Sequence, residues 1–400
     1  MLLILISWLE SLNIKCFHVF QYSSTRMMLA ALTTLLLTIF LGPLFIRKLY
    51  ALKIGQPIRT KEECPFLAEL HSKKKNTPTM GGILILLSLT IALFLWMDLK
   101  NMFTWILLFT MLFLGLIGVY DDYLKLKLKT SDGMRAKWKF FMQILCASCV
   151  GIYLLVPAVT TWIGKTKVVP PVAKEFSMTK MNKHPPITLS CKEYVKRFYV
   201  PFFKEHLFVL NSLLAFFLVI ITIVGSSNAV NLADGLDGLA SGCLILVALV
   251  LAIFAFLSNN IQIAHYLNIL YIEGSGEIAI FLVALIGALL GFLWYNSFPA
   301  QMFMGDVGSL ALGGIIGVVS VLLSREMLLF IVGGVFVVEA LSVILQVMSY
   351  KYRNKKRLFL CSPLHHHFEY KGWAETKVVM RFWIIGLILA IIGIASLKFQ

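Results

Sequence analysis

The stretch NAVNLADGLDGLASGCLILVALVLAIFAFL, residues 228–257, places two asparagines and two aspartates among glycines, and its last twenty residues carry no charge. About 20 apolar residues are enough to cross a bilayer as an α-helix at 1.5 Å per residue. Inside the bilayer only a helix or a closed barrel satisfies the backbone N–H and C=O groups, and runs of this length favour the helix. The stretch therefore predicts a transmembrane helix with a polar cluster at its start.

Similar apolar runs recur along the whole chain of 400 residues. Hydrophobic residues make up 59% of the chain and charged residues 14%, and the mean hydropathy is +0.85, which excludes an ordinary soluble domain. We predict an all-α integral membrane protein with about ten transmembrane helices. The predicted crossings are residues 27–46, 79–97, 102–120, 137–157, 208–225, 238–257, 277–296, 307–324, 327–349 and 379–398.

The predicted crossings form one polytopic membrane domain, residues 27–400, because no fixed-period repeat divides the chain. Residues 1–26 precede it and are interpreted as an interfacial segment, since they lack the basic start and the small-residue cleavage site of a signal peptide. Residues 158–207 are a long, basic and Pro-rich loop, predicted to be extracytoplasmic and irregular over much of its length, to which we assign no chemistry. Residues 351–378 form a second loop, which contains histidines.

The basic residues predict the orientation. The connections 47–78, 121–139 and 350–381 hold 8, 6 and 8 of the 36 Lys and Arg residues, and loops with such an excess stay in the cytoplasm. Ten crossings then place both the N and the C terminus on the extracytoplasmic side of the cytoplasmic (inner) membrane. The net charge of +16 fits retention of these loops and attraction to anionic lipid, and it also fits an anionic substrate.

Five polar clusters fall on the predicted cytoplasmic side. They are residues 73–82, 120–123, 228–239, 303–309 and 363–369. An acidic side chain costs about 2.5 to 3.5 kcal/mol at mid-helix in a bilayer and less near the interface, so an acid at membrane depth is a candidate for function. A structural scaffold would leave these acids unexplained, and a secondary transporter would place its site near the bilayer midplane.

Three aspartates of these clusters are candidate metal ligands. Asp121 and Asp122 are adjacent, and adjacent helical residues point about 100° apart, so we expect both to reach one metal only where the helix frays. Their predicted place at a helix C-terminus opposes the helix dipole, which favours a function over a solvated helix end. Asp306 precedes a glycine-rich crossing, where it is either a helix cap or a ligand of the kind that Mg²⁺ prefers beside phosphate oxygens.

The other clusters offer groups for binding a nucleotide. Asn228 and Asn231 have a spacing of three, as do Asp234 and Asp237, which on a helix puts each pair on one face. Amides can bind a base edge or a sugar hydroxyl, although Asn and Asp also cap helices. Phe303 offers a ring on which a base can stack, although one Phe in a membrane protein is ordinarily part of the core.

Basic side chains complete the set. Residues 73–75 are lysines before a predicted helix start, where they either bind an anion or retain the loop in the cytoplasm. Residues 365–367 are three consecutive histidines, which suit an irregular loop and can bind metal or phosphate, and they lack the spacing of a zinc site. Carboxylates for a metal, amides, a ring and cations together predict phosphoryl-sugar transfer from a soluble nucleotide sugar to a lipid phosphate.

The motifs TPTMGG (77–82), DD (121–122), NAVNLADGLDGL (228–239), FMGDVGSLALGG (303–314) and PLHHHFE (363–369) resemble, in this order, those of the phospho-N-acetylmuramoyl-pentapeptide transferase family. This family belongs to the polyprenyl-phosphate N-acetylhexosamine-1-phosphate transferases. The resemblance implies a Mg²⁺-dependent enzyme of peptidoglycan and cell-wall synthesis, and so of cell shape and division. It would convert UDP-N-acetylmuramoyl-pentapeptide and undecaprenyl phosphate to lipid I and UMP, with its active site at the cytoplasmic face. Members are commonly homodimers.

The resemblance also implies residue roles. Asp306 would be the principal Mg²⁺ ligand, Asp121 the base for the lipid phosphate with Asp122 beside it, and His365 a further catalytic residue. Direct attack by the lipid phosphate is our preferred mechanism, and a covalent aspartyl intermediate is the alternative. The implied substrate-binding residues are Lys74, Thr79, Asn231, Asp234, Gly235, Leu236, Asp237, Phe303 and Gln346 for the uridine diphosphate, and Lys125, Lys137, Asn296, His365 and His366 around the phosphates and the loop that closes over them.

The chain departs from the family pattern at a few places. Residues 57–70 and 160–197 are longer than is typical, and Ala233 stands where Thr is frequent, but no charged site residue is lost. The nearest alternative function is the transfer of N-acetylglucosamine phosphate to the same lipid. An enzyme of that kind would keep the aspartates and differ in the histidine loop.

Overall fold

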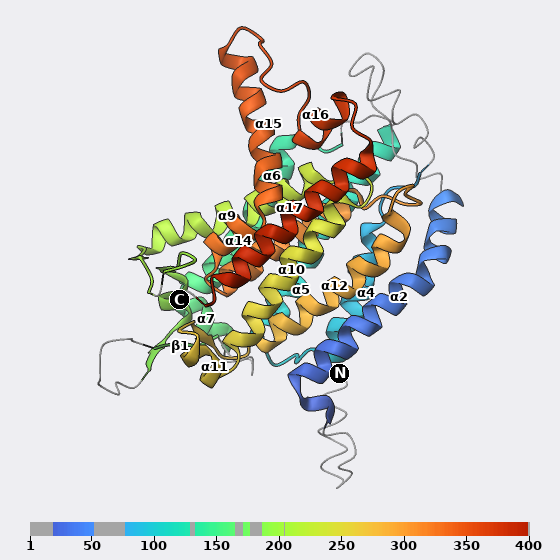
Figure 1. Cartoon of the computed structure of the whole chain (residues 1–400). Helices are drawn as coiled ribbons and strands as arrows, with labels where there is room; N and C mark the ends of the chain where they lie inside the picture. Colours follow the sequence, from blue (N-terminus) through green and yellow to red (C-terminus); the bar gives the residue numbers. More distant parts are fainter. Residues whose placement is uncertain are drawn as a thin grey trace.

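A computed structural model of the chain describes residues 19–51, 77–128, 133–164, 171–176, 186–203 and 205–398. Its long helices run side by side in one bundle (Figure 1). Over these ranges nine helices are long and apolar enough to cross a membrane, which confirms the prediction of an all-α integral membrane protein. They are α2 (Ser23–Ala51), α5 (Met102–Leu128), α6 (Ala136–Leu155), α9 (Ser212–Ala233), α10 (Leu239–Ser258), α12 (Gly276–Asn296), α13 (Gly305–Leu322), α15 (Gly334–Tyr352) and α17 (Glu375–Ala395).

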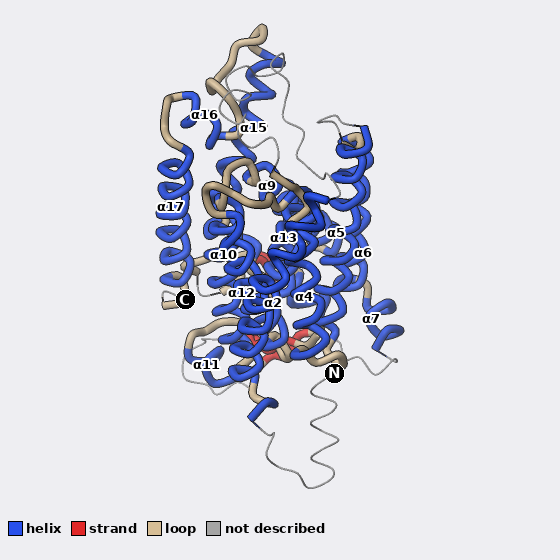
Figure 2. Tube along the Cα trace, turned by 90° about the vertical axis from the view of Figure 1, so that its right-hand side faces the viewer, coloured by secondary structure: helices blue, strands red, loops and turns tan. Residues whose placement is uncertain are grey.

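Each of the ten predicted crossings contains a helix of the structure. The tenth is α4 (Gly82–Trp96), which is apolar throughout but only 15 residues long. The predicted crossing 327–349 is divided into α14 (Glu326–Val332) and α15, because two successive glycines, Gly333 and Gly334, interrupt it and glycine is a weak helix former. Figures 1 and 2 show that α15 extends beyond the end of the other helices, next to α16 (Leu364–Tyr370).

Helix α13 lies at the centre of the bundle and packs against α4, α5 and α9. Its residues are buried almost without exception from Val307 onward. The approach to α4 is so close that a Cβ atom at Gly82 would lie 2.2 Å from the backbone nitrogen of Gly308. Small residues permit such backbone contact between membrane helices, which explains why this segment is rich in glycine.

The opposite end of the bundle from α15 and α16 carries the short elements (Figure 2). A three-stranded antiparallel sheet has the order β2-β1-β5, with Ala173 of β1 opposite Leu189 of β2 and Ile272 of β5. The described part of the 158–207 loop contains only short regular elements, separated by irregular backbone. The short elements at this end are α7 (Pro157–Gly164), β1 (Ala173–Glu175), β2 (Ile187–Leu189), α8 (Cys191–Val195), β3 (Arg197–Phe198), β4 (Phe208–Val209), α11 (Ile261–Tyr266) and β5 (Tyr271–Ile272).

The start of α2 and the end of α17 point toward the end that holds this sheet, as an even number of crossings requires (Figure 1). A buried ion pair fixes α2 there: Arg26 Nη1 lies 2.7 Å from Glu277 Oε1, and Glu277 Oε2 also accepts a hydrogen bond from the Asp98 N–H at 2.8 Å. Because both charges are buried, loss of one partner would leave the other uncompensated, at a cost of about 3–5 kcal/mol. Which end faces the cytoplasm stays a prediction from the basic loops, and the interfacial segment 1–26 lies largely outside the described residues.

Candidate active site

Helix α5 brings two aspartates and a lysine to the end of the bundle opposite the sheet. It continues to Leu128, two turns beyond its predicted end, so Asp121 and Lys125 are four residues apart on one helical face. Both aspartates are buried. Asp121 Oδ1 accepts a hydrogen bond from the Met134 N–H at 2.7 Å, and Asp122 Oδ2 accepts one from a backbone N–H of α13 at 3.3 Å. Each carboxylate is therefore held by a backbone N–H through one oxygen, and its other oxygen faces Lys125.

The third aspartate comes from the first turn of α13. Asp306 follows Gly305, whose φ of +72° is a conformation that glycine adopts without strain. Its Oδ1 accepts a hydrogen bond from Asn231 Nδ2 at 2.8 Å, and the same amide group donates to Ser309 Oγ at 2.8 Å. A Cβ atom at Gly118 of α5 would lie 2.4 Å from the Asp306 carbonyl oxygen, so a glycine is required for α5 to approach this turn.

Two lysines bind the aspartates together. Lys125 Nζ lies 2.7 Å from Asp121 Oδ2 and 2.8 Å from Asp306 Oδ2. Lys139 Nζ of α6 lies 2.5 Å from Asp306 Oδ2 and 3.6 Å from Asp121 Oδ2. The sequence had predicted Lys137 for this place, but Lys137 is exposed. Residues 137 and 139 are two positions apart on the helix, so their side chains point about 200° apart, and only Lys139 faces the bundle. The available signal for this choice was that Lys139 shares a helical face with Gln143, the next polar residue of α6, which is buried.

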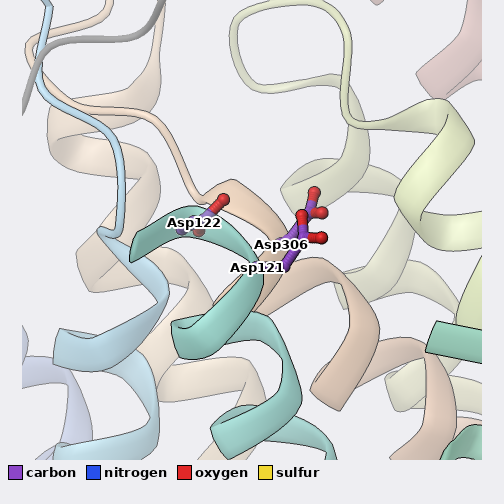
Figure 3. A group of neighbouring side chains, drawn as sticks. All are labelled: Asp121, Asp122 and Asp306. Carbon is purple, nitrogen blue, oxygen red and sulfur yellow. The ribbon is translucent and has the colours of Figure 1, made fainter. Parts of the chain in front are cut away.

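The carboxylates of Asp121, Asp122 and Asp306 form a candidate cation site (Figure 3). One oxygen of each lies within 4.8 Å of the others, a spacing that no other such group among the described residues shares. The expectation that both α5 aspartates reach one site only from a frayed helix is wrong. The helix is intact, and two side chains that diverge by about 100° can both reach a group placed between them.

The donor set fits a hard cation, since it consists of carboxylate oxygens alone. Three carboxylates and two ammonium groups give a net charge of −1, and a bound dication would change it to +1. A positive site of this kind attracts a diphosphate, whereas the site without the dication repels it. The residues present are therefore consistent with Mg²⁺.

Next to these carboxylates, residues 234–238 form a turn between α9 and α10, so the expectation that Asp234 and Asp237 share a helical face is wrong. Asp237 is buried, accepts a hydrogen bond from the Ala300 N–H at 3.0 Å and donates its own N–H to Glu375 Oε1 at 2.9 Å. Asp234 keeps one side accessible, yet desolvation, followed by the nearby carboxylates, raises its pKa to about 8. The turn thus presents Asp234 and holds Asp237 inside.

Two asparagines near the turn bind protein groups. Asn296 is buried, accepts a hydrogen bond from the Gly238 N–H at 3.1 Å and donates to the Met302 carbonyl at 3.0 Å. Asn228 donates to Gln143 Oε1 at 2.8 Å and so ties α9 to α6. Asn296 therefore supports two loops of the site from behind, and the phosphate contact predicted for it stays a prediction.

The three histidines lie on α16, so the expectation of an irregular loop is wrong. Because consecutive helical residues diverge by about 100°, each ring meets a different partner. The ring of His365 is fully buried with Nδ1 3.2 Å from Glu339 Oε2, and His366 Nδ1 lies 2.7 Å from Glu369 Oε2. His367 accepts a hydrogen bond from the preceding loop, and desolvation lowers its pKa.

The segments around Thr79 and Phe303 are joined through their backbones. The Phe303 N–H donates to the Pro78 carbonyl, and the Gly81 N–H donates to the Phe303 carbonyl, each at 2.8 Å. These bonds bring the two predicted substrate residues to the same end of the bundle as the aspartates, with Thr79 buried. The other predicted substrate residues are placed as follows: Gly235 is exposed beside His365, Leu236 is buried, Gln346 bonds to the loop before α16, and Lys74 lies outside the described residues.

Comparison with known proteins identifies the family. The model of glycosyl transferase family 4 matches residues 104–324, and signature 1 of the phospho-N-acetylmuramoyl-pentapeptide transferases matches residues 74–86. A phospho-N-acetylmuramoyl-pentapeptide-transferase of Protochlamydia amoebophila is 61% identical, with 100% of both chains covered. One of Desulfotalea psychrophila is 48% identical, with 96% of both covered. The chain belongs to the phospho-N-acetylmuramoyl-pentapeptide transferase family.

The family's two matched segments contain the three clustered aspartates and Thr79, which the sequence resemblance had singled out. Residues beyond position 324 lie outside both matches, including Glu339 and His365. Sequence reasoning missed two contacts near the aspartates and histidines, those of Lys139 with Asp306 and of Glu339 with the start of α16. Lys139 was detectable from helical phase, whereas the contact of Glu339 with α16 depends on how two helices fold against each other.

Proposed function

We propose that this chain transfers phospho-N-acetylmuramoyl-pentapeptide from its uridine diphosphate carrier to undecaprenyl phosphate, giving lipid I and UMP. The observation that carries the proposal is the group formed by Asp121, Asp122 and Asp306 with two lysines at one end of a membrane bundle. Family membership supplies the substrate class. A soluble nucleotide sugar and a membrane lipid can meet only at such an end, because one substrate is in water and the other in the bilayer.

The chemistry requires one bond to form and one to break. An oxygen of the lipid phosphate attacks the β-phosphorus of the nucleotide sugar, the bond from that phosphorus to the bridging oxygen breaks, and UMP leaves with the bridging electron pair. Asp306, with Asp121 and Asp122, would hold Mg²⁺, which when bound neutralises charge on the diphosphate. Lys125 and Lys139 hold these carboxylates in place and can contact the phosphates.

Asp121 is our candidate for the base that removes a proton from the lipid phosphate. Its Oδ1 is held by the Met134 N–H, and its Oδ2 faces the two lysines. Direct attack needs only this proton transfer. The alternative is a covalent intermediate on an aspartate, which requires a second displacement, and direct attack stays our preferred route.

The metal assignment is tested by Asp306→Asn in the purified full-length protein. UMP release from UDP-N-acetylmuramoyl-pentapeptide should fall by at least about 10²-fold, because the amide removes a negative ligand and one charged partner of each lysine. Asp98→Asn, a partly exposed aspartate at the other end of the bundle, is the control and should keep wild-type activity. Retained activity in Asp306→Asn would contradict the metal site.

The nearest alternative function, transfer of N-acetylglucosamine phosphate to the same lipid, differs only in the sugar that is transferred. If the wild-type protein releases UMP from UDP-N-acetylglucosamine and not from UDP-N-acetylmuramoyl-pentapeptide, the rival function is correct. A secondary transporter is disfavoured because the clustered acids lie in the last two turns of α5 and the first turn of α13, at one end of the bundle rather than near its middle. The proposal further includes the inner membrane as the location, a cytoplasmic active site and the homodimer implied by the resemblance.

A further inference from the structure

Helix α15 carries a polar stripe that holds the segment before and within α16. Glu339, Gln346 and Ser349 are seven and three residues apart, which places them on one helical face. Ser349 Oγ donates to the Lys356 carbonyl at 3.0 Å, and Gln346 Oε1 accepts hydrogen bonds from the N–H groups of residues 358–359 at 3.0 and 2.9 Å. The predicted substrate residue Gln346 is therefore occupied by its own chain.

Glu339 makes the innermost contact of this stripe. Its side chain is fully buried, Oε2 accepts a hydrogen bond from the Leu364 N–H at 2.8 Å, and Oε1 accepts one from the His365 N–H at 3.1 Å. These are the first N–H groups of α16, which have no partner within the helix and favour a negative charge. Among the ion pairs of the described residues, the one basic partner of Glu339 is the His365 ring.

The same carboxylate orients that ring. His365 Nδ1 lies 3.2 Å from Glu339 Oε2, at an angle too oblique for a hydrogen bond, so the contact is electrostatic. Because an ionised carboxylate only accepts, it favours the tautomer with its hydrogen on Nδ1. Nε2 is buried without a hydrogen-bond partner in the described part of the chain, and it faces Gly235, where a Cβ atom would lie 2.3 Å from it.

We propose that Glu339 is a positioning residue for the transfer reaction, which holds the first turn of α16 and fixes His365 with its Nε2 directed at the 234–238 turn. The kinetic consequence rests on the proposed function, since it requires His365 to exchange a proton with a substrate phosphate. The tautomer of His365 does not depend on that function. The two parts can therefore be tested separately.

The kinetic test uses a double-mutant cycle in the purified full-length protein. Glu339→Gln should lower kcat for UMP release by about 10- to 100-fold, as loss of a residue that orients a catalytic imidazole does, with KM for the nucleotide sugar changed by less than about threefold. In a His365→Gln background the same substitution should change kcat by less than about twofold, because its target is already gone. An equal loss in both backgrounds would show a structural role and overturn the proposal.

The control removes a side chain that caps the start of another short helix, far from the candidate site. Asn260 Oδ1 accepts hydrogen bonds from two N–H groups at the start of the short helix α11, at the other end of the bundle. Asn260→Ala should leave kcat unchanged. If Glu339→Gln does not fold, Glu339→Asp keeps the charge, and it should lose less activity than Glu339→Ala; equal losses in the two would count against positioning.

The spectroscopic test uses histidine labelled with nitrogen-15 in the imidazole ring, with the His365 signals assigned by comparison with His365→Gln. Wild-type protein should show the tautomer with hydrogen on Nδ1, and Glu339→Gln should lose this preference. A wild-type ring with hydrogen on Nε2 alone would overturn the proposal even if the enzyme is active. Wild-type protein that shows the expected tautomer but releases no UMP would instead contradict the proposed function.

Discussion

Substitution of Gly118 by alanine should separate the two helices that build the cation site. A Cβ atom at this position of α5 would lie 2.4 Å from the Asp306 carbonyl oxygen and 2.4 Å from the Val307 Cα, and both are backbone atoms that cannot rotate away. Ordinary contact begins at 3.4 Å, so the helices must move apart by about 1 Å, the difference between these distances. Asp121 and Asp122 lie one turn further along α5 and would move with it.

The expected effect on stability is small and the effect on activity is large. Overpacking costs about 1–3 kcal/mol, and alanine recovers about 1 kcal/mol of helix propensity, so Gly118→Ala should lose no more than about 2 kcal/mol and stay folded. A displacement of about 1 Å between catalytic groups can lower a rate by about 10²-fold. We therefore expect kcat to fall by that factor and the Mg²⁺ concentration for half-maximal activity to rise.

UMP release at increasing Mg²⁺ concentration measures both effects, and thermal unfolding in detergent checks the fold. Gly225→Ala is the matched control: it also changes a membrane-helix glycine, but no atom lies within 4 Å of the added Cβ, so its activity should equal that of the wild type. A Gly118→Ala protein with wild-type kcat and wild-type Mg²⁺ dependence would refute the view that contact between α5 and α13 assembles the site.

Two further substitutions test neighbouring parts of the site. Lys139→Ala should lower kcat for UMP release by at least about tenfold, because Asp306 loses its 2.5 Å contact with the ammonium group. Lys137→Ala, at an exposed position, should have little effect. If Lys137→Ala loses more activity than Lys139→Ala, the residue predicted from the sequence is the correct one. Gly235→Ala should lower kcat by about tenfold or more with a small change in thermal stability, because the new Cβ would displace the ring of His365. Unchanged kinetics would show that the ring can move without loss of activity.

The sequence predicted most of the secondary structure because long apolar runs have only one stable form in a bilayer. All ten predicted crossings correspond to helices, with boundaries that differ by up to eight residues. The division of the ninth at Gly333 was missed, because the run is hydrophobic on both sides and only its two glycines differ. Helix α5 was predicted too short, since Asp121 and Asp122 resemble a helix end in sequence but are buried and paired in the structure.

The candidate site was predicted in part. Acids at membrane depth are costly, so Asp121, Asp122 and Asp306 stood out from the sequence, and the structure brings them together. Roles that depend on the direction of a side chain were less accessible. The bonds of Asn296 to two loops were not foreseen, while its predicted phosphate contact stays a prediction. Lys137 was selected two residues from Lys139, the lysine that contacts the aspartates.

The sequence alone determined that this protein lies in a membrane as a helical bundle and which acidic residues are candidates for its chemistry, because both conclusions follow from the cost of polar groups in hydrocarbon. The tertiary structure decided which side chains meet. Asp121 and Asp306 are 185 positions apart, and their contact depends on the approach of two helices at Gly118. Glu339 contacts His365 because α16 folds back onto α15, and a hydropathy pattern contains no information about that return.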